Sequence, residues 1–231
     1  MRCIKFGLVG LARVLVLASV GFDERFIVRH IVSTGLGVGS EDIIYAFIPT
    51  GDDERGLRVI EAVKELISRY GLHLTVDSLS LDVGDFWGSA GKVRRTVEDV
   101  SKKRSPQAMH ILLGGGMRVL GFIIFTGALA ARYKPQESTT YIYREDLRGH
   151  ITFPLEIFKI ERPPQHIIDT LMALMDSGKS SSISSLARSL RIAKSTLHRR
   201  VAYMEKTGLV TIERRGRSSR IKLLDPAKLW I

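Results

Sequence analysis

The first 160 residues alternate between short apolar runs and longer segments whose apolar residues recur with a helical period. A short apolar run between glycine, proline or polar residues is typical of a strand, and flat hydrophobicity is typical of strands buried on both faces. We expect strands at residues 14–20, 43–48, 73–81, 109–113, 139–143 and 151–158, the last two joined as a hairpin across residues 146–149. Helical spacing occupies residues 24–34, 53–70, 85–103 and an apolar segment that ends near residue 133. Alternating strands and helices predict βαβ units and a mainly parallel sheet.

A different pattern follows Pro163 and Pro164, which resist both helix and sheet. Three amphipathic helical segments come first, and a serine-rich loop at residues 180–182 offers N-caps for the second of them. Two strands, at residues 209–213 and 220–224, then flank an arginine-rich turn. The order of helix, helix, short turn, helix and basic hairpin predicts a winged helix-turn-helix.

Positive charge is concentrated in this second region. The formal net charge of the chain is +11, and residues 162–231 hold 14 Lys and Arg against 5 Asp and Glu, whereas residues 1–161 are nearly neutral at +2. A basic end indicates a polyanionic partner, although a merely soluble basic surface would carry the same charge. We expect a sheet domain at residues 1–158, a linker at 159–164 and a winged-helix domain at 165–231.

The third helical segment suits the major groove of double-stranded DNA, because its outward face is polar and basic. Lys194 and Arg200 flank this face, where phosphates would lie, and the hairpin arginines can reach the adjacent backbone or minor groove. The residues that we expect to contact DNA are Lys194, Ser195, Thr196, His198, Arg199, Arg200, Tyr203, Arg214, Arg215, Arg217 and Arg220.

The segment IAKSTLHRRVAYMEKTGLVTIERRGRSSRIKL resembles winged-helix regulators of the multiple-antibiotic-resistance and arsenic-repressor type. The short turn, the Ser-Thr pair at the start of the helix and the Gly-Leu-Val that enters the hairpin carry this resemblance. It implies a DNA-binding regulator. The alternative is a winged helix used for protein contacts, which rarely keeps so basic a helix and wing.

Two loops of the sheet domain suit a phosphate. In open parallel sheets, ligands bind at the carboxyl ends of strands, and the loops at residues 20–24 and 113–118 follow two of the expected strands. Consecutive glycines at 114, 115 and 116 allow close approach of backbone N–H groups, and Arg118 adds a positive charge at a helix N-terminus. Tight packing would explain the same glycines, and the Walker pattern is absent.

The order of strand, Gly-Phe-Asp, helix, then strand, Gly-Gly-Gly-Met-Arg, apolar helix, then winged helix resembles the CRISPR-associated Rossmann-fold (CARF) regulators of prokaryotic type I loci. The resemblance implies a Rossmann-like, mainly parallel α/β domain that binds a cyclic oligoadenylate, most often the four-adenylate ring, at a homodimer interface. Carried over by position, the ligand site contains Gly21, Phe22, Asp23, Glu24, Gly114, Gly115, Gly116, Met117 and Arg118, with Thr50 and Gly51 as weaker candidates.

One departure from this family bears on enzyme activity. Broader CARF domains often have Ser or Thr and Lys in the second motif, where this chain has Gly116, Met117 and Arg118. This puts ligand cleavage in doubt, and we find no convincing catalytic set and no metal-binding pattern. We expect a regulator without a cofactor. A ring nuclease that degrades the messenger, and a metabolite-responsive repressor with another anionic ligand, stay open as alternatives.

The single cysteine, Cys3, excludes an internal disulfide framework and favours a cytoplasmic protein. Arg13 interrupts the apolar start of the chain, so residues 14–20 read better as a buried strand than as a secretory signal. Residues 1–12 read either as part of the domain or as an over-long start. The apolar stretch 119–131 falls short of the ~20 residues that span a bilayer, so we expect no membrane partner.

Overall fold

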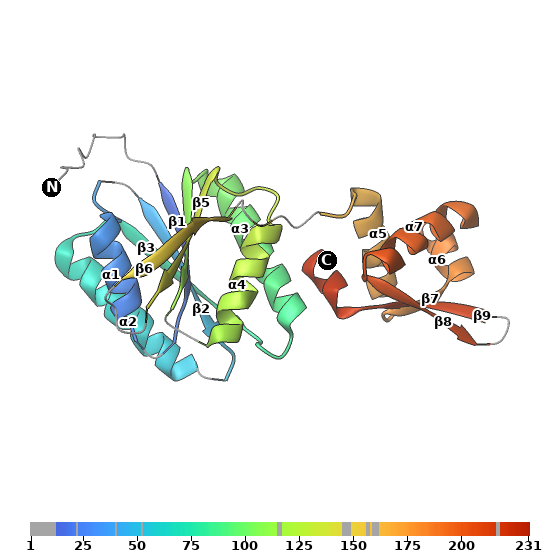
Figure 1. Cartoon of the computed structure of the whole chain (residues 1–231), viewed down its shortest axis with the longest axis horizontal. Helices are drawn as coiled ribbons and strands as arrows, with labels where there is room; N and C mark the ends of the chain where they lie inside the picture. The colour runs from blue at the N-terminus through green and yellow to red at the C-terminus, as the bar shows by residue number, and fades with distance from the viewer. Residues whose placement is uncertain are drawn as a thin grey trace. The chain divides into compact units, whose positions relative to one another are not determined.

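A computed structural model gives the fold and describes residues 13–21, 23–39, 41–51, 53–114, 117–144, 149–155, 158, 162–215 and 218–231. The chain divides into two compact units, Met1–Lys159 and Ile160–Ile231 (Figure 1).

The first unit is built on a sheet whose strands lie in the order β3-β2-β1-β4-β5-β6. The strands are β1 (Val14–Ser19), β2 (Asp42–Pro49), β3 (Leu74–Leu81), β4 (Ala108–Leu113), β5 (Glu137–Tyr143) and β6 (His150–Pro154). The first five are parallel, and β6 pairs antiparallel with β5. The prediction of a Rossmann-like, mainly parallel α/β domain is therefore confirmed.

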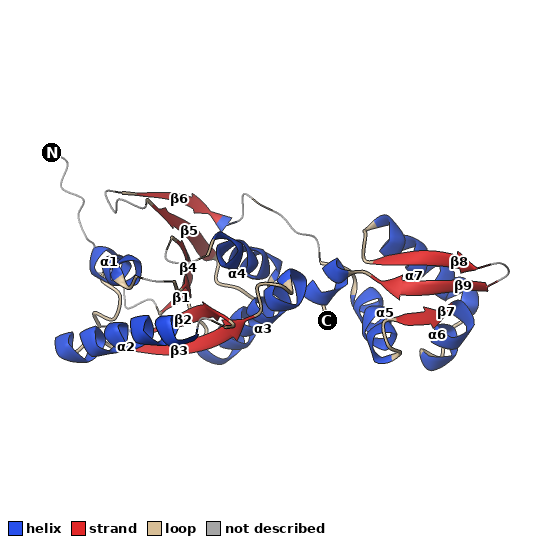
Figure 2. Cartoon of the chain, turned by 90° about the horizontal axis from the view of Figure 1, so that it is seen from below, coloured by secondary structure: helices blue, strands red, loops and turns tan. Residues whose placement is uncertain are grey.

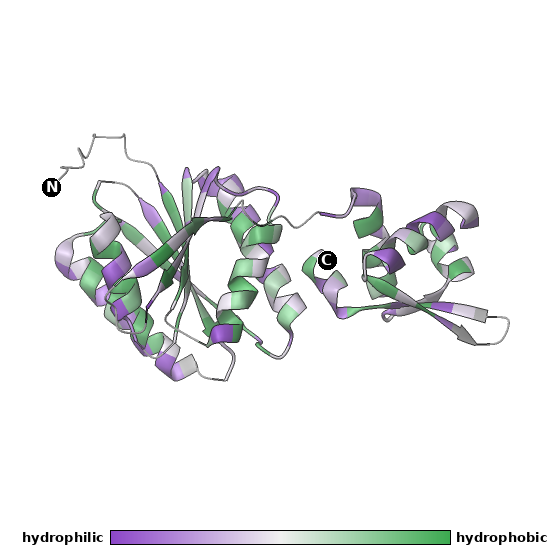
Figure 3. Cartoon of the chain, viewed as in Figure 1, coloured by the Kyte–Doolittle hydropathy of each residue, from purple (hydrophilic) through white to green (hydrophobic). Residues whose placement is uncertain are grey.

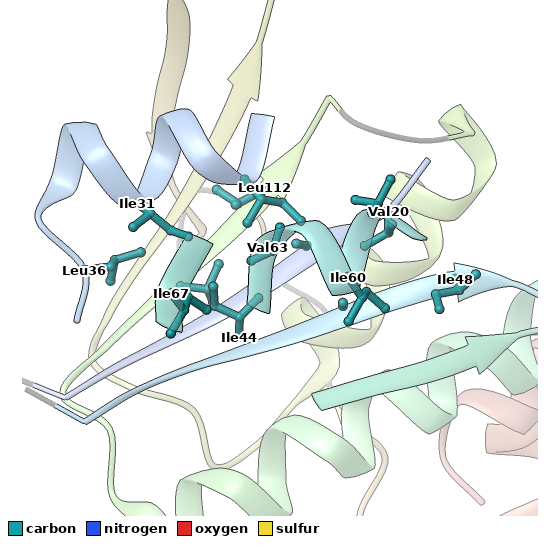
Figure 4. Packing of buried hydrophobic residues seen from close by; sticks show 14 of the residues in the cluster. Val20, Ile31, Leu36, Ile44, Ile48, Ile60, Val63, Ile67 and Leu112 are labelled. Carbon is teal, nitrogen blue, oxygen red and sulfur yellow. The ribbon is translucent and has the colours of Figure 1, made fainter. Parts of the chain in front are cut away.

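Four helices cover the two faces of this sheet: α1 (Arg25–Thr34), α2 (Asp53–Tyr70), α3 (Phe86–Arg104) and α4 (Arg118–Ala130). Helices α1 and α2 lie on one face, and α3 and α4 lie on the other (Figure 2). Alternate residues of each strand face opposite layers, so both faces of the central strands must be apolar. Ile31, Ile60, Val63 and Ile67 of α1 and α2 pack with Ile44 and other strand residues in one buried cluster (Figure 4).

The expected extents of these elements agree with the structure to within three residues, except in one strand. The strand expected at residues 151–158 ends at Pro154, which has no N–H group to continue the ladder. Beyond it, the Phe158 N–H donates to the Leu155 carbonyl in a turn, and the Phe158 ring packs on Phe125 and Phe153. Leu155 is therefore buried, and Phe158 packs on two rings while staying partly exposed, without extending the sheet.

The described residues of the second unit form three α-helices, a short 3-10 helix and a three-stranded antiparallel sheet of order β7-β9-β8. Its elements are α5 (Gln165–Asp176), β7 (Ser180–Ser182), α6 (Ile183–Ser189), α7 (Lys194–Lys206), β8 (Val210–Arg215), β9 (Ser218–Leu223) and a final 3-10 helix, η2 (Asp225–Leu229). This confirms the predicted winged helix. The serine-rich loop expected before α6 is wrong in part, because Ser181 pairs with Ile221 and makes these serines the strand β7.

Candidate ligand-binding edge and nucleic-acid interface

The strand order creates a switch point beside β1. This strand pairs with β2 on one side and with β4 on the other, and Ala18 near its end is the partner of both Ala46 and Leu112. The helix after β1 and the helix after β4 lie on opposite faces of the sheet. In open α/β sheets, such a reversal opens a crevice at the carboxyl ends of the two strands. The two loops singled out from the sequence leave these two strand ends.

The first loop is held by a hydrogen bond to β2 and by hydrogen bonds of its own. Val20 is buried, and its N–H donates to the Phe47 carbonyl at 2.9 Å. The Asp23 carboxylate accepts from the backbone N–H and the guanidinium of Arg25, so it caps the start of α1 and forms an ion pair. The hydrogen bond from the Arg25 side chain lowers the pKa of Asp23. This carboxylate is thus neutralised within the loop and does not oppose an anion with a free charge.

The other residues of this loop have less defined roles. Gly21 and Glu24 are half-buried, and the Glu24 carbonyl accepts from the Val28 N–H in the first turn of α1. Phe22, a predicted ligand residue, lies outside the described residues. Thr50 and Gly51 follow the neighbouring strand β2 at the same edge and are exposed. Gly51 has a φ of +94°, a backbone conformation that residues with a Cβ rarely adopt.

The second loop leads from β4 into α4. Gly114 is exposed yet packed, since a Cβ there would lie 3.0 Å from Tyr143 Cβ and 3.3 Å from Phe26 Cδ1. Gly115 and Gly116 lie outside the described residues. Met117 precedes α4 without giving it a side-chain cap, and Arg118, the first helical residue, is exposed. The N–H groups of the first turn and the Arg118 guanidinium together make this helix start a favourable place for an anion.

A buried aromatic cluster lies behind the same edge, between α1 and the strands β4 and β5. His30 is fully buried, with Nδ1 2.8 Å from Tyr143 Oη and Nε2 3.0 Å from His110 Nδ1. Burial lowers the pKa of His30 to about 3, with the nearby His110 and His150 adding to the shift, and burial lowers the pKa of His110 to about 4. Both rings are therefore neutral at neutral pH.

This cluster reaches the edge through residues that sequence reasoning missed. His150 opens β6, and because β6 is antiparallel its first residue pairs with Tyr143 at the carboxyl end of β5. The exposed His150 ring lies 5.2 Å from the Tyr143 ring. The Phe26 ring of α1 lies 6.2 Å from the same Tyr143 ring, in an edge-to-face arrangement. Phe26 and Tyr143 thus border Gly114, and His150 lies against Tyr143. No local signal marks them, because their positions depend on the hairpin register and on the packing of α1.

In the second unit, α7 buries one side and exposes the other. Leu197, Val201 and Met204 are buried against the other helices, as their spacing predicts. Lys194, Ser195, His198 and Arg199 are exposed. The polar and basic side of the recognition helix is therefore open to a partner, as docking in the major groove requires.

The predicted DNA residues on α7 do not all face the same way. Thr196, Arg199, Arg200 and Tyr203 line a groove of about 470 Å³ that α7 forms with the start of α5. The Arg200 guanidinium spans this groove, and its Nη1 donates to the His166 carbonyl and to Thr170 Oγ1, both at 3.0 Å. Arg200 thus fastens α7 to α5, whereas Arg199 is exposed beside it.

The structure describes most of the wing backbone but not the side chains of three predicted DNA-contacting arginines. Arg214 and Arg215 lie in β8, and their side chains fall outside the described residues, as does the whole of Arg217. Arg220 is exposed on β9, opposite Glu213. Lys222 lies beside it and forms an ion pair with Glu213 at 3.5 Å.

Two kinds of feature are absent from the described part of the chain. No three His, Cys, Asp or Glu side chains come together there as metal ligands. None of the helices within the described ranges combines the length and the apolar character that crossing a bilayer needs.

Two family models match the chain. The model described as the Csa3 CRISPR-associated Rossmann-like domain matches residues 14–154, from the start of β1 to the end of β6, and the MarR family model matches residues 166–221, from α5 into β9. No curated protein matches. The two matches confirm the predicted resemblance to CARF regulators with a winged helix.

Proposed function

The chain belongs to the family defined by the Csa3 CRISPR-associated Rossmann-like domain, and from this premise we propose that its first unit senses a cyclic oligoadenylate, with cyclic tetra-adenylate as the favoured ring. With a MarR-type winged helix attached, the protein is a CRISPR-associated transcriptional regulator. In the proposal, the messenger binds at the carboxyl edge of the sheet and changes how the winged helix engages operator DNA.

The strand order is the observation that carries the proposal. Because β1 lies beside β4, the loops of Asp23 and Arg118 leave adjacent strand ends on opposite sides of a switch point. The uncapped start of α4 and the exposed Arg118 supply N–H donors and a positive charge for phosphates. The Asp23 carboxylate is already paired with Arg25 and adds little repulsion.

An exposed apolar surface supports a homodimer as the state that binds the ring. Phe122 on α4, Ile151 on β6 and Phe158 are 65%, 63% and 46% exposed. Ile142 pairs with Ile151 across the hairpin, and it is exposed as well. Exposed apolar side chains can mark protein contacts, and burying them between two copies of the chain would suit a two-fold dimer. A symmetric ring would then meet two copies of each loop.

Calorimetric titration of the full chain with cyclic tetra-adenylate tests the proposal. Arg118→Ala removes a charge-assisted contact, so we expect the affinity to fall by about 10- to 150-fold, equivalent to roughly 1.5–3 kcal/mol. Arg188→Ala is the matched control, because Arg188 is an exposed arginine of α6 in the other unit of the chain. The control should bind the ring as the unchanged protein does.

Three outcomes oppose the proposal. Equal affinity of Arg118→Ala and Arg188→Ala would mean that the ring does not bind at the start of α4. A linear oligoadenylate product in the titrated sample would identify a ring nuclease instead of a sensor. A rise in melting temperature with another anionic metabolite, and none with cyclic oligoadenylates, would identify a metabolite-responsive repressor.

A further inference from the structure

A basic surface lies at the opposite edge of the sheet from the proposed ligand site. Helices in βαβ units run against their strands, so α3 ends near the amino end of the sheet, where the Arg13 guanidinium before β1 donates to the Arg104 carbonyl at 2.8 Å. The last turn of α3 holds Lys102, Lys103 and Arg104, and hydrophilic residues mark this end of the helix (Figure 3). Together with Arg132 and Tyr133, which follow α4, these residues form what we call the amino-edge surface.

Two cations of this surface lie over the exposed ring of Tyr133. Tyr133 is 46% exposed, with Lys102 Nζ 4.8 Å and Arg132 Cζ 5.3 Å from the centre of its ring. A cation over a ring is attracted by the ring quadrupole and keeps its full charge. Among the described residues, no carboxylate forms an ion pair with Lys102, Lys103, Arg104 or Arg132.

The basic turn alone has a simpler explanation, because lysine and arginine stabilise the C-terminal end of a helix dipole. That explanation covers Lys102, Lys103 and Arg104. It does not cover Arg132 and Tyr133, which belong to a different element and gather on the same surface. It also contrasts with α2, where Arg58, Lys64 and Arg69 are each paired with a glutamate of their own helix.

From this arrangement we infer that the amino-edge surface binds the phosphodiester backbone of duplex DNA. Ion-unpaired cations beside an exposed aromatic ring fit a polyanion, and the chain already has DNA as a partner through its winged helix. Contacts to phosphates add affinity and carry no base information. The sheet unit would therefore extend the DNA contact of the regulator without altering which sequence is read. This inference depends on DNA binding and not on the messenger.

The test compares two triple variants of the full chain on a duplex that lacks operator sequence. Lys102→Gln/Lys103→Gln/Arg132→Gln removes three charges from the amino-edge surface, and Arg58→Gln/Lys64→Gln/Arg69→Gln removes three charges from α2. Each phosphate contact contributes about 0.9 to the slope of log affinity against log salt, so the first variant should show a slope shallower by roughly 2. The α2 variant should keep the slope of the unchanged protein.

The same pair is then compared in an Arg199→Ala background, which weakens the winged helix. Salt-sensitive binding that remains there should disappear only with the amino-edge variant. Equal slopes for the two triple variants would overturn the inference, and so would competition by poly-glutamate as strong as competition by DNA of equal charge. The melting temperature and the affinity for cyclic tetra-adenylate should be the same for both variants. A failure of messenger binding can therefore be distinguished from a failure of the amino-edge surface to bind DNA.

Discussion

The two units use their polar residues in opposite ways. The sheet unit buries His30 completely, and it buries Arg94 and Glu98 as an ion pair at 3.0 Å. The Glu98 carboxylate also accepts a hydrogen bond from the Arg132 backbone N–H. The winged helix leaves the basic face of α7 open. Burying a polar group is tolerable only when its bonds are made inside the protein, so such groups fix one arrangement of the interior. The exposed cations of α7 are instead accessible to a binding partner.

The largest expected effect concerns the buried histidines. Their folded pKa values of about 3 and about 4 lie below the unfolded value near 6.5, so the unfolded chain binds more protons as the pH falls from 6.5. The free energy of unfolding should not depend on these two groups above pH 6.5. Below it, the stability should drop by up to about 1.4 kcal/mol per pH unit for each histidine. Urea unfolding of the full chain between pH 7 and 5 measures this slope.

The matched variants assign the slope to the cluster. His30→Gln/His110→Gln replaces both rings by amides that can hydrogen-bond but do not titrate, so the acid-sensitive slope should flatten. His198→Gln changes an exposed histidine of α7 and should leave the slope unchanged. An identical slope in the double variant would mean that the contrast between buried and exposed polar groups does not control acid stability.

Neighbouring arginines of α7 give the next largest effect. Arg199→Ala should weaken operator binding by about 10- to 150-fold, or roughly 1.5–3 kcal/mol, because a charged contact to DNA is lost. The free energy of unfolding of Arg199→Ala should equal that of the unchanged protein. Arg200→Ala should lower the free energy of unfolding by about 1–3 kcal/mol, because the two hydrogen bonds that join α7 to the His166 carbonyl and the Thr170 hydroxyl are lost. Chemical unfolding and fluorescence anisotropy on both variants provide the comparison.

The distinction between these arginines would be wrong if both variants lost stability equally. Arg200→Lys refines it, since a lysine keeps the positive charge but cannot reproduce the planar donor geometry of a guanidinium. If Arg200 acts mainly on the packing of α5 against α7, the lysine variant should be destabilised while keeping most of its affinity for DNA. The opposite outcome would make Arg200 a phosphate contact first.

The winged helix could be predicted from the sequence because its elements are specified by nearby residues. The spacing of Leu197, Val201 and Met204 fixes the buried side of α7, and Gly178 has a φ of +80° just beyond α5. The strand β7 was missed because three serines have no apolar period, and only pairing with β9 makes them a strand.

The sheet unit was predicted in its elements but not in its strand order. Periodicity identifies β1 and β4 as strands, and only their pairing brings the two loops together. The contacts of His30 with His110 and Tyr143 join residues 80 and 113 positions apart in the chain. No local pattern encodes such contacts. The predicted ligand and DNA residues therefore stay predictions about chemistry, and the structure adds neighbours for some of the described ones, such as Asp23, Gly114 and Arg200.

The smallest expected effect tests whether local capping has a measurable role in the winged helix. Ser182 ends β7 and caps α6, because its hydroxyl accepts from the Ser185 N–H at 3.1 Å. Ser182→Ala should lower the free energy of unfolding by about 1 kcal/mol, since an N–H at the helix start loses its partner. Ser182→Asp should restore the cap, because an aspartate also accepts from these N–H groups and favours the positive end of the helix dipole. Differential scanning calorimetry on the two variants measures the effect. Equal melting temperatures for Ser182→Ala and the unchanged protein would mean that the pairing of β7 with β9, and not the cap, positions α6.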